Sequence, residues 1–262
     1  MKNLDRFKKF YDKVNNPLTE ENLEVIVNKW QESKSLDQYY KKMTEDNYPK
    51  FRCGLTDDSY NYHIKNKGKW HYYGDMGIDK AEKIKHQLFI SAGIEMQDRI
   101  IQDFIDGCDR NEISFLLKAT PDKRNDNIVL YATDENFFDY LELLRTLGWD
   151  LLRFDDILKR SFTPAITGLL EPSILTGRVC SWVGYGAKPK DCDTYIESRV
   201  NFLDESIPNV IDKDSKIADK KAVLEYLKRY LIRKGEENNI DPDNFAFSNE
   251  FAEEIKTKVK KK

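Results

Sequence analysis

A lysine and an arginine stand six residues apart in a segment where we expect two β-strands. Lys118 comes near the end of the apolar run at 113–117, and Arg124 follows in the polar loop at 121–126. A lysine that is withdrawn from water, or that lies beside a second cation, has a lowered pKa and can act as a general base. Arginine binds phosphate through a planar fork of donors. The pair indicates chemistry at a phosphate group, although each residue alone also fits an ordinary charged surface.

A second polar group lies on the strand expected around residue 70. Lys69, His71 and Tyr73 alternate with Trp70 and Tyr72, so the two sets point to opposite faces. We expect the two aromatic residues of the second set to face the core. The lysine and the histidine would then share a polar, concave face that suits a dianionic phosphate and its leaving group. In the alternative interpretation, His71 is an exposed or a structural histidine.

Three further residues are candidates for the same site. His63 lies in a setting similar to that of His71 and is its rival. Tyr131 ends the second expected strand, and the sequence leaves open whether it faces the core or the site. Arg178 follows a glycine, in a glycine-rich stretch where backbone N–H groups can approach an anion closely. Walker A, GxGxxG, GxSxG and HExxH patterns are all missing from the sequence.

The hydrophobic pattern predicts an α+β fold. Apolar residues at helical spacing predict helices, and alternating ones predict strands. The expected helices cover 1–46 with a break at Asn16-Pro17, 79–106 with a candidate break at Gly93, 134–148, 192–206 and 217–234. The expected strands cover 60–73 as a hairpin, 113–120, 127–133 and 179–183. We expect the strands on either side of the 121–126 loop to form an antiparallel hairpin. The result is a central antiparallel sheet flanked by helices, with a helical N-terminal layer.

The expected boundaries follow from turn and cap signals. We expect Thr19 to begin the second helix and Asp134 to cap the helix that ends at Gly148. Residues 1–50 form the helical layer, and residues 51–262 form the α+β part. No low-complexity linker separates them, so we expect one continuous domain overall.

Composition excludes several classes of function. The net charge is −3 over 262 residues, whereas proteins that coat nucleic acid are clearly basic. The four cysteines and three histidines show no metal-ligand spacing, so we expect no metal site built from them. No apolar run approaches the ~20 residues of a membrane span, and the N-terminal segment lacks the apolar region of a signal peptide. We expect a cytoplasmic protein that, if it is exported to a host cell, travels without a classical signal peptide.

The order of these candidates resembles a known group of proteins. The order resembles that of the phosphothreonine lyases of bacterial type III effectors. It consists of a strand with Lys69-x-His71, a helical segment, a strand with Lys118, and then Arg124 before a strand with Tyr131. The segment FLLKATPDKRNDNIVLYAT is similar to the HopA-type effector domain, which recurs as the lyase part of some lanthipeptide synthetases. A later stretch, PAITGLLEPSILTGRVCSWVGYG, is similar to the same family. The likeness covers roughly residues 60–205.

The resemblance implies a role for each candidate. Lys118 would remove the α-proton, and His71 would protonate the leaving phosphate oxygen, with Tyr131 near the site. The phosphate would be held by several cations: Lys69, Arg124 and a further arginine, either Arg178 or Arg199. The family's activity needs neither metal nor organic cofactor. The spacing between His71 and Lys118 is longer than in the compact lyases, and the N-terminal helical region has no counterpart in them.

Three hypotheses follow from the sequence. The first is a phosphothreonine or phosphoserine lyase that acts by β-elimination on a host protein or on a precursor peptide in lanthipeptide biosynthesis. The second is a non-catalytic module of the same fold that binds a phosphopeptide, a partner protein or a chaperone. The third is a protein that stacks nucleic-acid bases on its tyrosines, against which the negative net charge argues. We expect no membrane partner.

Overall fold

The computed structural model describes nine ranges of the chain: 4–39, 62–67, 70–75, 83–120, 126–146, 171–180, 182–189, 194–211 and 220–259. The chain divides into two compact units. The helical unit comprises 1–46, 174–178 and 186–262, and the sheet unit comprises 47–173 and 179–185.

The sheet unit is built on a central sheet. Within this unit the strands lie in the order β1-β2-β4-β5-β3-β7. Their bounds are β1 His63–Lys67, β2 Trp70–Gly74, β3 Ile84–Ile90, β4 Leu116–Ala119, β5 Ile128–Thr133 and β7 Val183–Ala187. The pairs β1/β2, β2/β4, β4/β5 and β5/β3 are antiparallel. The expected α+β fold and its two hairpins, β1/β2 and β4/β5, are confirmed.

The predicted helix over residues 79–106 is wrong in its first half. Ile84–Ile90 forms β3, and the helix α5 begins only at Ile94 and ends at Arg110. Ile84 and Leu88 are four residues apart, a spacing that fits a helix as well as one face of a strand. The apolar run from Leu88 to Ile90 is continuous because β3 lies inside the sheet and is buried on both faces.

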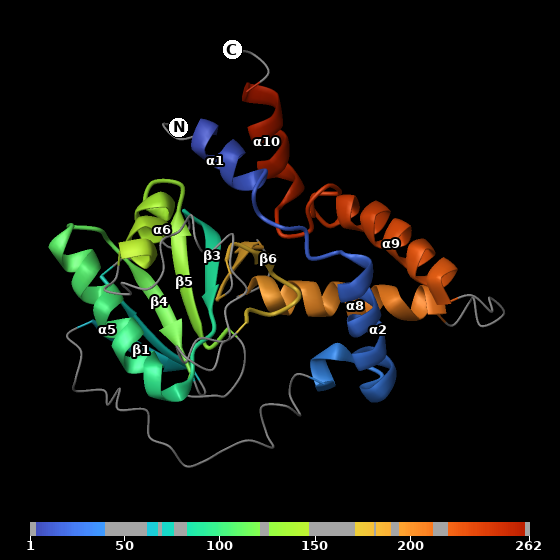
Figure 1. Ribbon diagram of the computed structural model, residues 1–262, viewed down its shortest axis with the longest axis horizontal. Coiled ribbons are helices and arrows are strands. Elements are labelled where there is room, and N and C mark those ends of the chain that lie inside the picture. The colour runs from blue at the N-terminus through green and yellow to red at the C-terminus, as the bar shows by residue number, and fades with distance from the viewer. Residues whose placement is uncertain are drawn as a thin grey trace. The chain divides into compact units, whose positions relative to one another are not determined.

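Two helices lie together on one side of this sheet, as Figure 1 shows: α5 and α6, which spans Phe137–Thr146. The Phe104 ring of α5 packs edge-on against Phe115, just before β4, and against Tyr140 of α6. Asp134 does not cap α6 as expected. Asn136 lies immediately before the helix, and its side chain accepts a hydrogen bond from the Thr133 N–H at 2.8 Å.

The helical unit draws on both ends of the sequence. It contains α1 Leu4–Tyr11, α2 Glu20–Ser33, the two-residue strand β6 Gly177–Arg178, α8 Tyr195–Ile211, α9 Lys220–Glu237 and α10 Asn249–Val259. In this unit α1 packs against α10, and α9 packs against both α2 and α8. Thr19 caps α2 as expected, since its hydroxyl accepts the Asn22 N–H at 3.1 Å.

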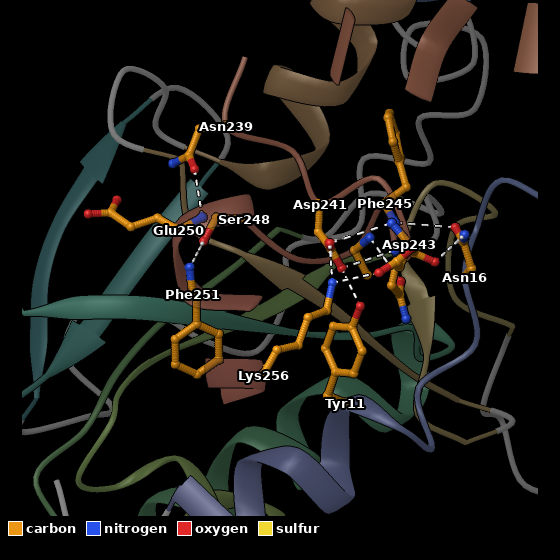
Figure 2. Close-up of polar contacts among 12 residues, drawn as sticks. Tyr11, Asn16, Asn239, Asp241, Asp243, Phe245, Ser248, Glu250, Phe251 and Lys256 are labelled. Atoms are coloured by element: carbon orange, nitrogen blue, oxygen red, sulfur yellow. Dashed lines mark hydrogen bonds and ion pairs between the residues drawn. The ribbon is translucent and has the colours of Figure 1, made fainter. Parts of the chain in front are cut away.

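A polar cluster fastens α1 to the loop before α10 (Figure 2). Buried Asp241 accepts hydrogen bonds from the Tyr11 hydroxyl and, at 3.0 Å, from the Lys256 ammonium. Lys256 also reaches Asp243 at 2.6 Å. Burial alone would lower the pKa of Lys256, but the hydrogen bonds to Asp243 and Asp241 raise it above its ordinary value. The cluster joins segments that are 230 residues apart in sequence.

Replacing the buried carboxylate of this cluster is expected to weaken the helical unit. Asp241→Asn should lower the free energy of unfolding by about 2 kcal/mol, because charged and hydroxyl donors would face an amide that can no longer accept from all of them. The matched variant Asp243→Asn alters a side chain that is 71% exposed and should cost well under half as much. Urea unfolding measures both variants, and equal losses would show that Asp241 is not the centre of the cluster.

Candidate functional site

A lysine is buried within the sheet unit. Lys118 of β4 exposes only 3% of its surface. Its ammonium nitrogen lies 4.3 Å from the ring centroid of Trp70, 5.8 Å from that of Tyr131 and 5.9 Å from that of Tyr72. Lysine is among the residues least often fully buried, and the negative faces of aromatic rings attract an ammonium group. The three rings therefore form an aromatic cage around the Lys118 side chain.

The pairing register explains the cage. Lys118 lies directly opposite Tyr72 on β2 and opposite Val129 on β5. Residues directly opposite each other in an antiparallel pair point to the same face, and so do residues two apart along one strand. Trp70 and Tyr131 therefore share this face, which we call the Lys118 face.

The register separates His71 from Lys118. His71 lies opposite Ala119, one residue beyond Lys118, so it points to the other face together with Tyr73. Tyr73 is buried in the core. The expected orientation of β2 is therefore wrong: the face that carries Trp70 and Tyr72 is the one with the lysine, and the structure does not bring His71 to it.

The structure places the other predicted residues in different settings. Lys69 and Arg124 lie outside the described residues, and so does the side chain of His63. Arg178 is exposed on β6 of the helical unit, where its carbonyl accepts the Asn15 N–H at 3.3 Å. Of the predicted site residues whose side chains are described, Tyr131 alone shares the Lys118 face.

Arg199 has a structural setting in the helical unit. It is buried on α8, and its Nε and Nη2 donate to the carbonyls of Phe245 and Phe247 at 3.1 and 3.4 Å. Its guanidinium also lies over the rings of Tyr195 and Phe245, at 4.5 and 4.8 Å from their centroids. These contacts hold the segment before α10 against α8, which explains a buried arginine without any ligand.

Two polar residues on the Lys118 face were missed in the sequence. Gln87 of β3 lies opposite Tyr131 and is buried. It falls in the segment whose pattern suggested a helix, so its face could not be assigned. Thr120 lies two residues after Lys118, and its N–H continues the ladder to the Asn127 carbonyl at 2.9 Å. Strand alternation alone would have placed Thr120 beside Lys118, so the signal for it was present.

A second buried network lies on the opposite face of the sheet. His86 of β3 lies opposite Ala132, one position from the pair on the Lys118 face. Its Nε2 is 2.9 Å from an Asp134 oxygen, and its Nδ1 is 3.0 Å from the Tyr185 hydroxyl. The other Asp134 oxygen accepts from Lys85 at 2.6 Å. An ionised carboxylate only accepts, so Nε2 donates to Asp134 and Nδ1 accepts from Tyr185. The network joins β3, the end of β5 and β7.

The network has a consistent protonation state. Burial lowers the pKa of His86, and the hydrogen bond to Asp134 opposes that change without cancelling it. Burial alone would raise the pKa of Asp134, but hydrogen bonds from His86 and Lys85 bring it down to about 2. At neutral pH the pair is a neutral imidazole beside a carboxylate. The arrangement therefore has a structural role, and we call these hydrogen-bonded residues, Lys85, His86, Asp134 and Tyr185, the His86–Asp134 clasp.

In the described part of the chain, histidine, cysteine and carboxylate side chains nowhere gather in groups of three or more that could hold a metal ion. Over the same residues, none of the helices combines the length and the apolar character that crossing a membrane requires.

No family model matches this chain, and no curated protein does. Among solved structures, an effector protein from Pseudomonas syringae pv. syringae matches with 14% sequence identity and a TM-score of 0.44, over 69% of this chain and 64% of that one. An effector protein from Pseudomonas syringae pv. tomato matches with 14% identity and a TM-score of 0.45, over 69% and 63%. The chain thus spans less than two thirds of the length of these effectors.

A likeness at this level says nothing about chemistry. The two neighbours are bacterial effectors. The more specific relation to phosphothreonine lyases, which the sequence suggests, stays a prediction.

The clasp is expected to make the fold sensitive to acid. The pKa values of His86 and Asp134 are both lower in the folded chain than in the unfolded chain. The stability that these two groups contribute is therefore complete above their unfolded pKa values, ~6.5 for histidine and ~3.9 for aspartate. It is lost as the pH falls toward the folded value of Asp134, about 2. Asp134→Asn should shrink the difference in unfolding free energy between pH 7 and pH 3 by about 1 kcal/mol. Urea unfolding at both pH values measures it.

The neighbouring exposed carboxylate offers a control for this measurement. Glu135→Gln should leave the pH dependence unchanged, because Glu135 is exposed and makes no such contact with His86 in the described structure. An unaltered pH dependence in Asp134→Asn would show that the clasp does not set the acid limit of the fold.

Proposed function

We propose that this protein eliminates phosphate from phosphothreonine or phosphoserine in a protein or peptide, with Lys118 as the base. One observation carries the proposal: Lys118 is withdrawn from water on one face of the sheet, among aromatic side chains. Lysine is seldom buried to this extent, because removing its ammonium group from water costs free energy. Buried ionisable groups of this kind are frequent at functional sites.

The reaction needs a base, an acid and a phosphate site. The neutral Lys118 amine takes the α-proton, and the electrons of that C–H bond form the Cα–Cβ double bond. The Cβ–O bond breaks, and phosphate leaves with its electron pair. The product is a dehydroamino acid and free phosphate, with no water consumed. A proton on the leaving oxygen assists this step.

The structure changes which residues are candidates for the general acid that protonates the leaving phosphate oxygen. Tyr131 and Tyr72 carry hydroxyl groups on the Lys118 face, whereas His71 lies on the other face. In the proposal a tyrosine of the cage therefore takes the place that the sequence gives to His71. Lys69 and Arg124 remain the proposed phosphate ligands, because both lie close in sequence to residues of this face.

Two opposing effects act on the Lys118 ammonium. Removal from water favours the neutral amine, which is the form that can accept a proton. The faces of three aromatic rings favour the cation. If burial dominates, Lys118 is a base. If the rings dominate, it stays a cation that binds phosphate without removing a proton, and the protein is a phosphopeptide-binding module of the same fold. The cage contacts are the observation that favours this second function.

Mass spectrometry of phosphopeptides distinguishes the two functions. Phosphothreonine and phosphoserine peptides incubated with the protein should lose phosphoric acid without regaining water. Lys118→Met keeps an unbranched side chain of similar length and should slow the reaction at least about 100-fold, as expected for removal of a general base. Lys83→Met, at an exposed lysine of the same unit, should react at the wild-type rate.

Other outcomes have definite meanings. Elimination that persists in Lys118→Met would remove Lys118 from the mechanism. Free phosphate with a restored hydroxyl would mean a phosphatase. Peptide binding that is abolished by Lys118→Met, with no elimination by the wild type, would establish the binding module instead.

A further inference from the structure

The hydroxyl group of Thr120 is buried near Lys118 and makes no hydrogen bond within the described residues. Thr120 exposes 1% of its surface, and its Oγ1 has no hydrogen-bond partner within the described residues. The backbone of Thr120 is tied to Asn127, so its strand geometry continues that of β4. Burying a hydroxyl without a partner costs free energy, and valine would fill the same volume without that cost. The fold therefore keeps a polar group that does not stabilise it.

The direction of this hydroxyl follows from the strand. Residues two apart on a strand point to the same face and are separated by roughly 6.7 Å. Thr120 thus lies on the Lys118 face, next along the strand from the lysine. Gln97 of α5 also carries buried polar atoms without a hydrogen-bond partner among the described residues, and it is fully buried. Helices α5 and α6 cover the opposite face, because His86 of that face touches Phe137 of α6.

We propose that the Thr120 hydroxyl donates a hydrogen bond to the phosphate of the substrate while Lys118 meets its α-proton. This inference rests on the proposed function and adds a substrate-binding residue to it. The α-hydrogen and the phosphate oxygens of one phosphothreonine are separated by a few ångströms, which fits two side chains at neighbouring positions on one strand face. A phosphate oxygen supplies the acceptor that the described residues of the free protein do not give to Thr120.

The test joins two measurements on Thr120→Val. The first is thermal unfolding without ligand, where the variant should be as stable as the wild type or more stable. The second is affinity for a phosphothreonine peptide whose ester oxygen is replaced by a methylene group, so that phosphate cannot leave. Affinity for this analogue should fall about tenfold. Thr120→Ser, which keeps the hydroxyl, should bind within about threefold of the wild type.

Gln97→Leu provides the matched control. It also removes an unpartnered buried polar group, so it should preserve or raise stability. It lies on α5 and should leave affinity for the analogue unchanged. A fall in affinity in both variants would mean that the loss at Thr120 is indirect, and would overturn the proposal.

The outcomes separate this inference from the proposed function. If Thr120→Val binds the analogue as tightly as the wild type, or is clearly less stable than it, the Thr120 proposal is wrong, and the lyase activity stands on its own assay. If the wild type binds the analogue but eliminates nothing, the lyase fails while the loss in Thr120→Val upholds the hydroxyl contact. If the wild type neither binds nor reacts, both are wrong.

Discussion

The antiparallel pairing of β4 with its two neighbours is the constraint on which the candidate site depends. It sets Lys118 opposite Tyr72 and Val129, and strand alternation then brings Trp70, Tyr131 and Thr120 to the same face. A slip of one residue in this register would turn every one of these side chains to the other face. The hydrogen-bond ladder therefore determines the composition of the site before any side-chain contact does.

The two faces of the sheet have different physical duties. One face meets α5 and α6 and is fastened by aromatic contacts and by the His86–Asp134 clasp, whose members satisfy one another. The other face keeps Lys118 in an aromatic cage and leaves the Thr120 hydroxyl without a partner among the described residues. Polar groups that are fully bonded stabilise a fold, whereas buried groups that lack partners burden it. This contrast separates the His86–Asp134 network from the Thr120 hydroxyl.

The helical unit is assembled from segments that are distant in sequence. Its N-terminal helices have few neighbours nearby in sequence, and α1 packs on α10 from the far end of the chain. Asp241 and Arg199 stabilise this arrangement through contacts with segments distant in sequence. Asp241 accepts from the Tyr11 hydroxyl, and Arg199 donates to the carbonyls of Phe245 and Phe247. Arg199 shows that a buried cation can be held by backbone carbonyl groups and aromatic rings. Burial alone therefore does not mark a phosphate ligand.

The sequence by itself determined the α+β class, the β1/β2 and β4/β5 hairpins and the place of Lys118 near the end of a strand, because each depends on residues that are close along the chain. Local pattern also contained the neighbour relation of Lys118 and Thr120. It failed at β3, where a strand buried on both faces has no alternation to distinguish it from a helix, and at Asp134, whose carboxylate binds His86 from another strand. Only the tertiary structure decided that His71 faces away from Lys118, because the register between strands depends on contacts that no single strand encodes.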